Sequence, residues 1–98
     1  MEPVRLAVVG AGLVGNRHAR LVSSQQHCSL VGICDTDSRR AAVAEQCYAP
    51  FYRDLEALLE ERSPEGAIIA TPNGTHSAIA EACIRKGVDI LIEKPIAD

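Results

Sequence analysis

VRLAVVGAGLVG, residues 4–15, runs from an apolar segment into a glycine-rich turn. Residues 4–9 are apolar on both faces apart from Arg5, which is typical of a strand buried within a parallel sheet. Gly10 closes that strand, and Leu13–Ser24 is expected to form a helix. The expected inward stripe of this helix, at helical spacing, consists of Val14, His18, Leu21 and Val22. The stretch therefore predicts a strand, a tight turn and a helix in direct succession.

The rest of the chain alternates in the same way between short apolar runs and amphipathic stretches. Further strands are expected at Ser29–Asp35, Tyr48–Phe51, Gly66–Ala70 and Asp89–Ile92. Further helices are expected at Ser38–Gln46 with Ser38 as N-cap, from Asp54 as cap through Arg62, and at Thr75–Lys86, which Gly87 ends.

Strands that alternate with helices predict βαβ units with right-handed crossovers. We therefore expect an α/β fold, a doubly wound parallel sheet with strand order 3-2-1-4-5. Asp89–Ile92 would then be an edge strand with unpaired backbone groups, and such an edge invites pairing with another chain.

The glycines follow the pattern G-x-G-x-x-G between a predicted strand and a predicted helix, which is the context of a dinucleotide-binding loop. Gly10 permits the tight turn, Gly12 lets a pyrophosphate approach the backbone, and Gly15 lets the helix pack closely on the strand. The unpaired N–H groups of the first helical turn, near Leu13 and Val14, would face the phosphates. The loop therefore predicts a site for a dinucleotide.

Asp35 lies 20 residues after Gly15, at the end of the second expected strand. A carboxylate there can accept both ribose hydroxyls and would repel a 2′-phosphate, so it favours NAD over NADP. Arg39 and Arg40 keep NADP possible, since either could meet a 2′-phosphate, although they could equally form a solvated helix face. The alternative for Asp35 and Asp37 is that they are only turn and cap residues. FAD would use the same glycine loop, but no other feature favours it.

Two polar motifs follow the last two strands, at 71–76 (TPNGTH) and at 93–95 (EKP). In an open parallel sheet, ligands bind beyond the carboxyl ends of the strands, so both motifs should face the crevice of the glycine loop. Asn73 could bind a ribose or phosphate group, whereas Thr75 could simply cap the next helix. His76 could lie near the cofactor or only begin that helix. The Glu-Lys pair could also be an ordinary surface ion pair.

The combination of G-x-G-x-x-G, an Asp ending the second strand, T-P-N-x-x-H and E-K-P resembles the glucose–fructose oxidoreductase/inositol dehydrogenase/rhizopine catabolism family, written Gfo/Idh/MocA. The resemblance covers all 98 residues and keeps the order and spacing of the motifs. The last motif is the most specific, because many Rossmann proteins have the first two. The resemblance implies a Rossmann fold with NAD as cofactor and NADP possible.

The resemblance also implies a role for each motif residue. The cofactor-binding residues it implies are Gly10, Gly12, Leu13, Val14, Gly15, Asp35, Thr71, Pro72, Asn73, His76, Glu93 and Lys94. The glycine loop would hold the pyrophosphate, Asp35 the adenosine ribose, and residues 71–76 the middle of the cofactor. Glu93 and Lys94 would lie by the nicotinamide, where Lys94 would contact the substrate hydroxyl as the catalytic residue.

Enzymes of this family are longer chains with a second domain that supplies most substrate contacts, the acid/base histidine and the oligomer interface. We therefore expect residues 1–98 to be the NAD(P)-binding Rossmann domain, a fragment of a two-domain enzyme, without the sixth strand and the C-terminal domain and inactive alone. At full length it would be a homo-oligomeric NAD(P)-dependent dehydrogenase. It would transfer a hydride between nicotinamide and a hydroxyl-bearing carbon of a sugar, cyclitol or related small molecule. The alternative is a non-catalytic dinucleotide-sensing or regulatory module of the same fold.

Composition excludes several other classes of protein. The chain is 47% apolar and 23% charged with a net charge of -3, which is ordinary for a globular domain and argues against nucleic-acid or anionic membrane partners. No apolar run is long enough to span a bilayer, and no signal peptide is recognisable, so a cytoplasmic location is expected. Cys28, Cys34, Cys47 and Cys83 lack C-x-x-C spacing, and three of them have the surroundings of buried thiols. We therefore expect neither a metal site nor a disulfide framework.

Overall fold

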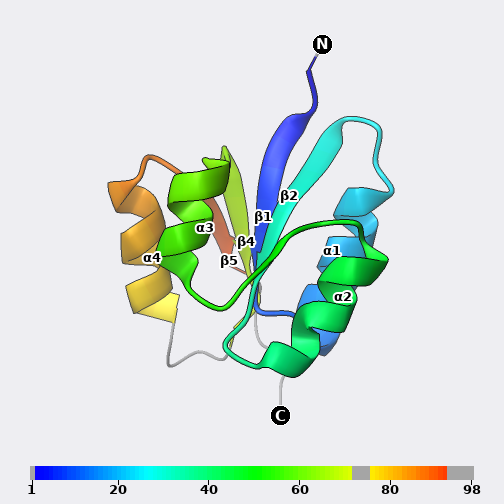
Figure 1. The fold of residues 1–98 in the computed structure, drawn as a ribbon. Coiled ribbons are helices and arrows are strands. Elements are labelled where there is room, and N and C mark those ends of the chain that lie inside the picture. The colour runs from blue at the N-terminus through cyan, green and yellow to red at the C-terminus, as the bar shows by residue number, and fades with distance from the viewer. Residues whose placement is uncertain (1, 72–75, 93–98) are drawn as a thin grey trace.

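The computed structural model describes residues 2–71 and 76–92, and within these ranges five parallel strands form one sheet. The strands are β1 (Val4–Val9), β2 (Cys28–Cys34), β3 (Phe51–Tyr52), β4 (Gly66–Ile69) and β5 (Asp89–Ile92). Their spatial order is β3-β2-β1-β4-β5, which confirms the predicted order (Figure 1). The helices between them are α1 (Leu13–Ser23), η1 (Ser38–Arg40), α2 (Ala41–Gln46), α3 (Leu55–Arg62) and α4 (His76–Arg85).

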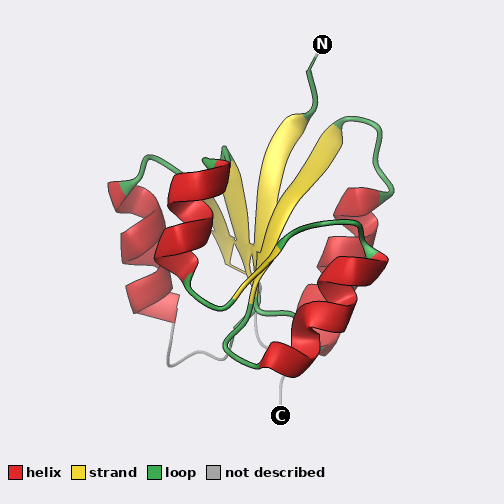
Figure 2. Ribbon diagram, in the orientation of Figure 1, coloured by secondary structure: helices red, strands yellow, loops and turns green. Residues whose placement is uncertain are grey.

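The helices cover the sheet in two layers, with α1 and α2 on one face and α3 and α4 on the other (Figure 2). The central strand β1 serves both layers, because its side chains alternate between the two faces. Val8 packs with the side chains of α1 and α2, whereas Ala7 and Val9 pack with those of α3 and α4. This double burial explains why Ala7–Val9, the buried half of β1, is continuously apolar.

The inner face of α1 is rotated from the predicted stripe. Its buried residues are Gly15, Ala19 and Val22, whereas Leu21 is 55% exposed. Of the four stripe residues predicted, only Val22 is buried. Small residues face the sheet because α1 packs closely at its start, and that close approach sets the rotation of the whole helix.

Several element ends differ from the predicted ones, and two of the differences at element starts have a clear local cause. The N-cap of the second helical segment is Asp37 rather than Ser38, because the Asp37 side chain accepts the Arg39 N–H at 3.0 Å. The third strand starts at Phe51 rather than Tyr48. Tyr48 has a φ of 56° in the turn that ends α2, so it cannot belong to an extended strand.

The carboxyl ends of four strands lie level with one another. The register pairs Val9 with Cys34 of β2 and with Ile69 of β4, and it pairs Ile69 with Ile92 of β5. The residues that follow each strand therefore emerge along one edge of the sheet, the lower edge in Figure 1. That edge is where an open parallel sheet binds its ligands.

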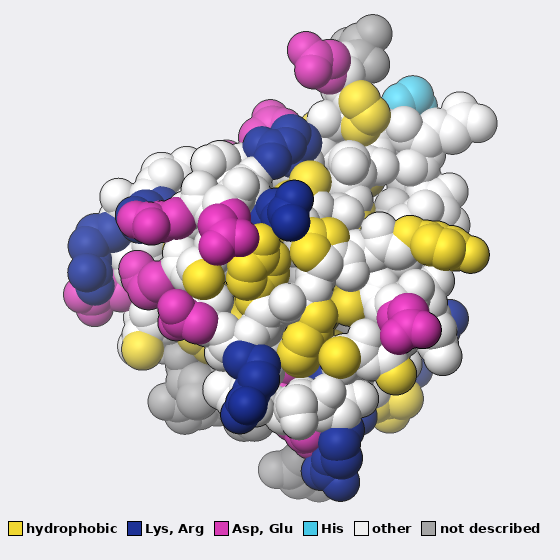
Figure 3. All heavy atoms as spheres, in the orientation of Figure 1, with side chains coloured by type: hydrophobic (Ala, Val, Ile, Leu, Met, Phe, Trp, Pro, Cys, Tyr) yellow, Lys and Arg dark blue, Asp and Glu magenta, His cyan; other side chains and the backbone are white. Residues whose placement is uncertain are grey.

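Charged side chains of both signs share the face drawn in Figure 3, where acidic side chains gather over α3 among scattered basic ones. The four cysteines are free thiols, and Cys34, Cys47 and Cys83 are buried as predicted. No group of three or more possible metal ligands occurs among residues 2–71 and 76–92. Within the same ranges, no helix is long and apolar enough to cross a membrane.

We expect the 98-residue chain to self-associate through β5. Among the described strands, β5 pairs only with β4, and Leu91 and Ile92 on it are 58% and 42% exposed. A free strand edge with apolar side chains is a template for pairing with another chain. Sedimentation velocity should show a fraction of dimer that rises with protein concentration, and Leu91→Lys should lower that fraction. Leu21→Lys is the matched control, since Leu21 is similarly exposed but lies on α1. A wild-type chain that stays monomeric at every concentration would contradict this prediction.

Candidate functional site

The turn between β1 and α1 requires glycine at its first position. Gly10 has a φ of +96°, in the left-handed region that side chains disfavour. A Cβ on Gly10 would lie 2.9 Å from Thr71 Cγ2 and 3.0 Å from the Ala70 carbonyl oxygen. The Gly10 N–H donates to the carbonyl of Cys34 at 2.7 Å. The turn therefore packs closely between the carboxyl end of β2 and the residues that follow β4.

The other two glycines of the loop have opposite surroundings. A Cβ on Gly15 would lie 1.6 Å from the Gly10 carbonyl oxygen, so α1 can approach the turn only because residue 15 is glycine. A Cβ on Gly12 would meet nothing within 4 Å. The backbone is thus closely packed at Gly15 and has free space beside it at Gly12. Free space at Gly12 is expected if a ligand approaches the backbone at that residue.

The N-terminus of α1 opens beside this space. Gly12 is the N-cap and provides no side chain, and the first turn of α1 has no acidic residue. The first N–H groups of a helix have no partner within the helix, and they carry the positive end of its dipole. Leu13 and Val14 occupy that first turn, as the sequence predicts. This arrangement is suited to an anionic group such as a phosphate.

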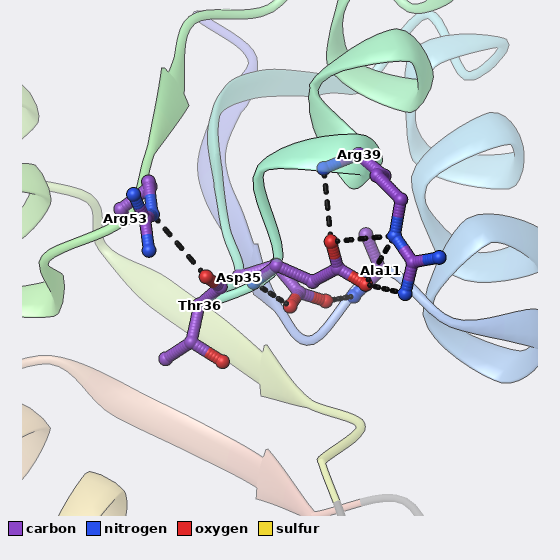
Figure 4. A network of polar contacts seen from close by, with 6 residues as sticks. Ala11, Asp35, Thr36, Arg39 and Arg53 are labelled. Carbon is purple, nitrogen blue, oxygen red and sulfur yellow. Dashed lines mark hydrogen bonds and ion pairs between the residues drawn. The ribbon is translucent and has the colours of Figure 1, made fainter.

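Asp35 links the end of β2 to the glycine loop. Its Oδ2 accepts the Ala11 N–H at 2.8 Å, and its Oδ1 accepts the Asp37 N–H at 2.9 Å (Figure 4). The side chain is half-buried at this position. Each carboxylate oxygen has a further lone pair, so Asp35 can still accept a hydroxyl. Asp35 is therefore a turn residue that also lies against the loop.

Asp37 is engaged by the next arginine along the chain. Arg39 binds both oxygens of the Asp37 carboxylate, with its Nη2 atom 2.8 Å from Oδ2. Hydrogen bonds from Arg39 lower the pKa of Asp37 to about 2. On the other side of the same loop, Arg53 donates to the carbonyl of Thr36 at 3.2 Å (Figure 4). Sequence reasoning missed both contacts, because no motif marks an arginine that binds a neighbouring carboxylate or one that reaches the loop from the end of another strand.

The carboxyl end of β4 completes the described part of the site. Thr71 follows this strand, and its carbonyl accepts a hydrogen bond from His76 Nε2 at 2.6 Å. His76 is also the first residue of α4, so both alternatives considered for it keep their physical basis. The structure thus brings together the glycine loop, Asp35 and Thr71. The predicted site residues Pro72, Asn73, Glu93 and Lys94, and the possible cap Thr75, lie outside the described residues.

We expect Cys34, directly before Asp35, to make the stability of the fold fall at alkaline pH. Burial, followed by the negative charge of Asp35, raises the pKa of this thiol from 9.0 to about 11. The folded chain therefore keeps the Cys34 proton where the unfolded chain releases it. The contribution of the protonated Cys34 thiol to the free energy of unfolding is complete below pH 9.0 and is lost as the pH rises to about 11.

Urea unfolding at increasing pH measures this effect. Cys34→Ser, which removes the thiol, should lose less stability than the wild-type chain between these pH values. Cys28→Ser is the matched control, because Cys28 is only half-buried. An equal alkaline loss in wild type and Cys34→Ser would contradict the prediction.

Comparison with known proteins identifies relatives of this chain. Residues 4–98 match the GFO_IDH_MocA family model, described as an oxidoreductase family with an NAD-binding Rossmann fold. Inositol 2-dehydrogenase 1 of Saccharopolyspora erythraea is 35% identical over 98 residues, which are 96% of this chain and 29% of that protein. UDP-N-acetylglucosamine 3-dehydrogenase of Acidithiobacillus ferrooxidans is 37% identical over 96 residues, or 97% and 29% of the two chains.

A solved structure agrees with these relatives. GenD2 from gentamicin A biosynthesis, in complex with NAD, superimposes with a TM-score of 0.91 at 31% identity, covering 97% of this chain and 28% of GenD2. This chain therefore spans less than a third of the length of the relatives it matches.

Proposed function

The chain belongs to the Gfo/Idh/MocA oxidoreductase family, with its NAD-binding Rossmann fold, and on this premise we propose that it is the cofactor-binding domain of a longer NAD-dependent dehydrogenase. The observation that carries the proposal is the contact of Asp35 Oδ2 with the Ala11 N–H. It sets a carboxylate beside the open side of a glycine loop. That is the arrangement in which one group accepts ribose hydroxyls and the helix N-terminus accepts a pyrophosphate.

The described residues fit the cofactor from its adenosine end to its pyrophosphate. Asp35 would accept the ribose hydroxyls, and the backbone of Gly12, Leu13 and Val14 would hold the pyrophosphate. Gly10 and Gly15 would belong to the same cofactor-binding loop and give it its shape. Thr71 and His76 would border the next part of the cofactor, together with Pro72 and Asn73. Glu93 and Lys94 would meet the nicotinamide.

The bound nicotinamide would supply the hydride chemistry. The chain's own contribution to the reaction would be Lys94, two residues beyond the end of β5, which would contact a substrate hydroxyl and help remove its proton. The names of the relatives support a sugar, cyclitol or related hydroxyl-bearing compound as substrate. The substrate site and the contacts of a homo-oligomer would belong to the rest of the longer protein. The cytoplasmic location stays a prediction.

Calorimetric titration with NADH tests the cofactor site. The folded chain should bind NADH, and Asp35→Ala should weaken binding by about tenfold to a hundredfold, the usual effect of losing hydrogen bonds to a charged group. Asp89→Asn is the matched control, because it removes one negative charge from the exposed start of β5, at the opposite edge of the sheet. A chain that is folded by circular dichroism yet binds no NADH would contradict the proposed function.

A further inference from the structure

The loop after β2 contains a second carboxylate whose geometry is unlike that of Asp35. Asp37 donates its backbone N–H to Asp35 Oδ1 at 2.9 Å, so the two carboxylates share one turn. The hydrogen bonds of its own side chain are made with Arg39 rather than with the glycine loop. It accepts the backbone N–H of Arg39 at 3.0 Å and the Arg39 guanidinium on both oxygens. The Asp37 carboxylate therefore binds both the backbone N–H and the guanidinium of Arg39.

Arg39 is placed where it would matter for the choice of cofactor. It lies in η1, directly after the loop of Asp35, and Figure 4 shows its guanidinium turned back toward the carboxylate of that loop to which it is bonded. An arginine near this position is the usual partner of a 2′-phosphate in NADP-binding Rossmann sites. The side chain is 87% exposed, so packing does not prevent it from moving. What restrains it is the two-oxygen ion pair with Asp37.

We propose that Asp37 sets the preference of this chain for NAD over NADP by holding the Arg39 guanidinium in an internal ion pair. The inference rests on the proposed function, because it concerns the ribose end of that cofactor site. Asp35 acts by accepting the ribose hydroxyls and repelling a phosphate. Asp37 acts through another residue, by withholding a cation, Arg39, that could compensate such a phosphate.

Two physical arguments support this division of roles. The Asp37–Arg39 pair joins residues two apart in sequence, so an incoming phosphate must compete with a carboxylate that is always adjacent. The low pKa of Asp37 keeps that carboxylate ionised at any pH used for binding. An exposed ion pair contributes little to stability, so breaking it should change ligand preference without unfolding the chain.

Calorimetric titrations of three proteins test the proposal, with NADH, NADPH, 5′-ADP and 2′,5′-ADP as ligands. The wild-type chain should prefer NADH. Asp37→Asn keeps an oxygen that can cap η1 but removes the charge. It should bind NADPH up to about fivefold more tightly, the most that an exposed ion pair releases when it no longer competes. Its affinity for NADH should stay within about twofold, since Asp35 is intact. In Asp37→Asn/Arg39→Gln the gain for NADPH should disappear.

The remaining ligands and variants locate the effect. The preference of Asp37→Asn for 2′,5′-ADP over 5′-ADP should rise with that for NADPH, which places the change at the 2′-phosphate. Glu45→Gln is the matched control, since it removes one exposed negative charge at the far end of α2. Glu45→Gln should leave the ratio of NADPH affinity to NADH affinity unchanged. Asp37→Ser retains a capping oxygen and replaces Asp37→Asn if that variant does not fold.

Three results would overturn the inference: an unchanged NADPH-to-NADH ratio in Asp37→Asn, a gain that persists in the double variant, or a wild-type chain that binds NADPH as tightly as NADH. Each of these leaves NADH binding in place, and so leaves the proposed function standing. A folded wild-type chain that binds neither dinucleotide would instead overturn the proposed function and this inference together.

Discussion

Gly15→Ala is expected to destabilise the fold by more than about 4 kcal/mol, a size seen only when a substitution has a specific structural cause. The cause here is the packing of α1 on the turn before it. The added Cβ would lie 1.6 Å from the Gly10 carbonyl oxygen and 2.6 Å from its carbon, both of them backbone atoms that cannot rotate away. Either α1 or the turn must move, and the turn is held between β2 and β4. Such a loss is a large part of the ~5–15 kcal/mol that stabilises a typical domain.

The direction of the stability change distinguishes the effect of packing from that of helix propensity. Helix propensity alone favours alanine over glycine by about 1 kcal/mol, so Gly15→Ala would stabilise α1 if packing did not matter. Urea unfolding followed by circular dichroism measures the difference. Gly12→Ala is the matched control, because its Cβ meets nothing within 4 Å. It should change stability by only about 1 kcal/mol, the scale of an N-cap effect, while weakening NADH binding. Near-wild-type stability in Gly15→Ala would show that the close packing is not required.

In the longer dehydrogenase proposed above, Lys94→Ala is expected to lower turnover by about a hundredfold to ten-thousandfold, the usual range for a residue that moves a proton in the transition state. The register is the structural reason. Ile92 of β5 lies level with Ile69 and, through it, with Val9, so the chain after β5 emerges at the edge that holds the glycine loop and Asp35. Under the proposed function, Lys94, two residues further along the chain, would meet a substrate beside the nicotinamide at this edge.

Steady-state kinetics and NADH titration together separate this role from a structural one. In Lys94→Ala the value of kcat should fall while the Kd for NADH stays within about threefold, because the lost interaction is made with the reacting substrate. The chain has one other lysine, Lys86, which pairs with Glu60 at 3.2 Å beyond the end of α4. Lys86→Ala should therefore leave kcat unchanged. Undiminished turnover in Lys94→Ala would rule out the proposed role of this lysine.

Much of the fold could be predicted from local sequence patterns. Residues 4–9 and Asp89–Ile92 form strands at the predicted positions, and the predicted strand order is confirmed. Both results follow from side-chain periodicity and from the right-handed connection of parallel strands, which leave few alternatives. The meeting of Gly10 and Asp35 at one edge could be predicted for the same reason, since both follow parallel strands.

The details that were mispredicted depend on close contacts between elements. The stripe expected on α1 included Leu21, which is exposed, because the approach at Gly15 turns small residues toward the sheet. Ser38 was expected to cap the next helical segment, yet the Asp37 oxygen makes that hydrogen bond. Serine and aspartate are both good caps, and only the path of the chain after Asp35 selects between them.

By itself the sequence determined the α/β topology, the glycine turn and the placement of Asp35 beside it, because periodicity and spacing act along the chain. Only the tertiary structure decided which face of α1 is buried, and that Gly15 is closed while Gly12 is open. It also decided that two arginines bind the loop after β2, Arg39 through the Asp37 carboxylate and Arg53 through the Thr36 carbonyl. These features depend on the distance between atoms of separate segments, or on which of several equivalent polar partners a side chain meets. Neither quantity has a period or a spacing that a sequence can display.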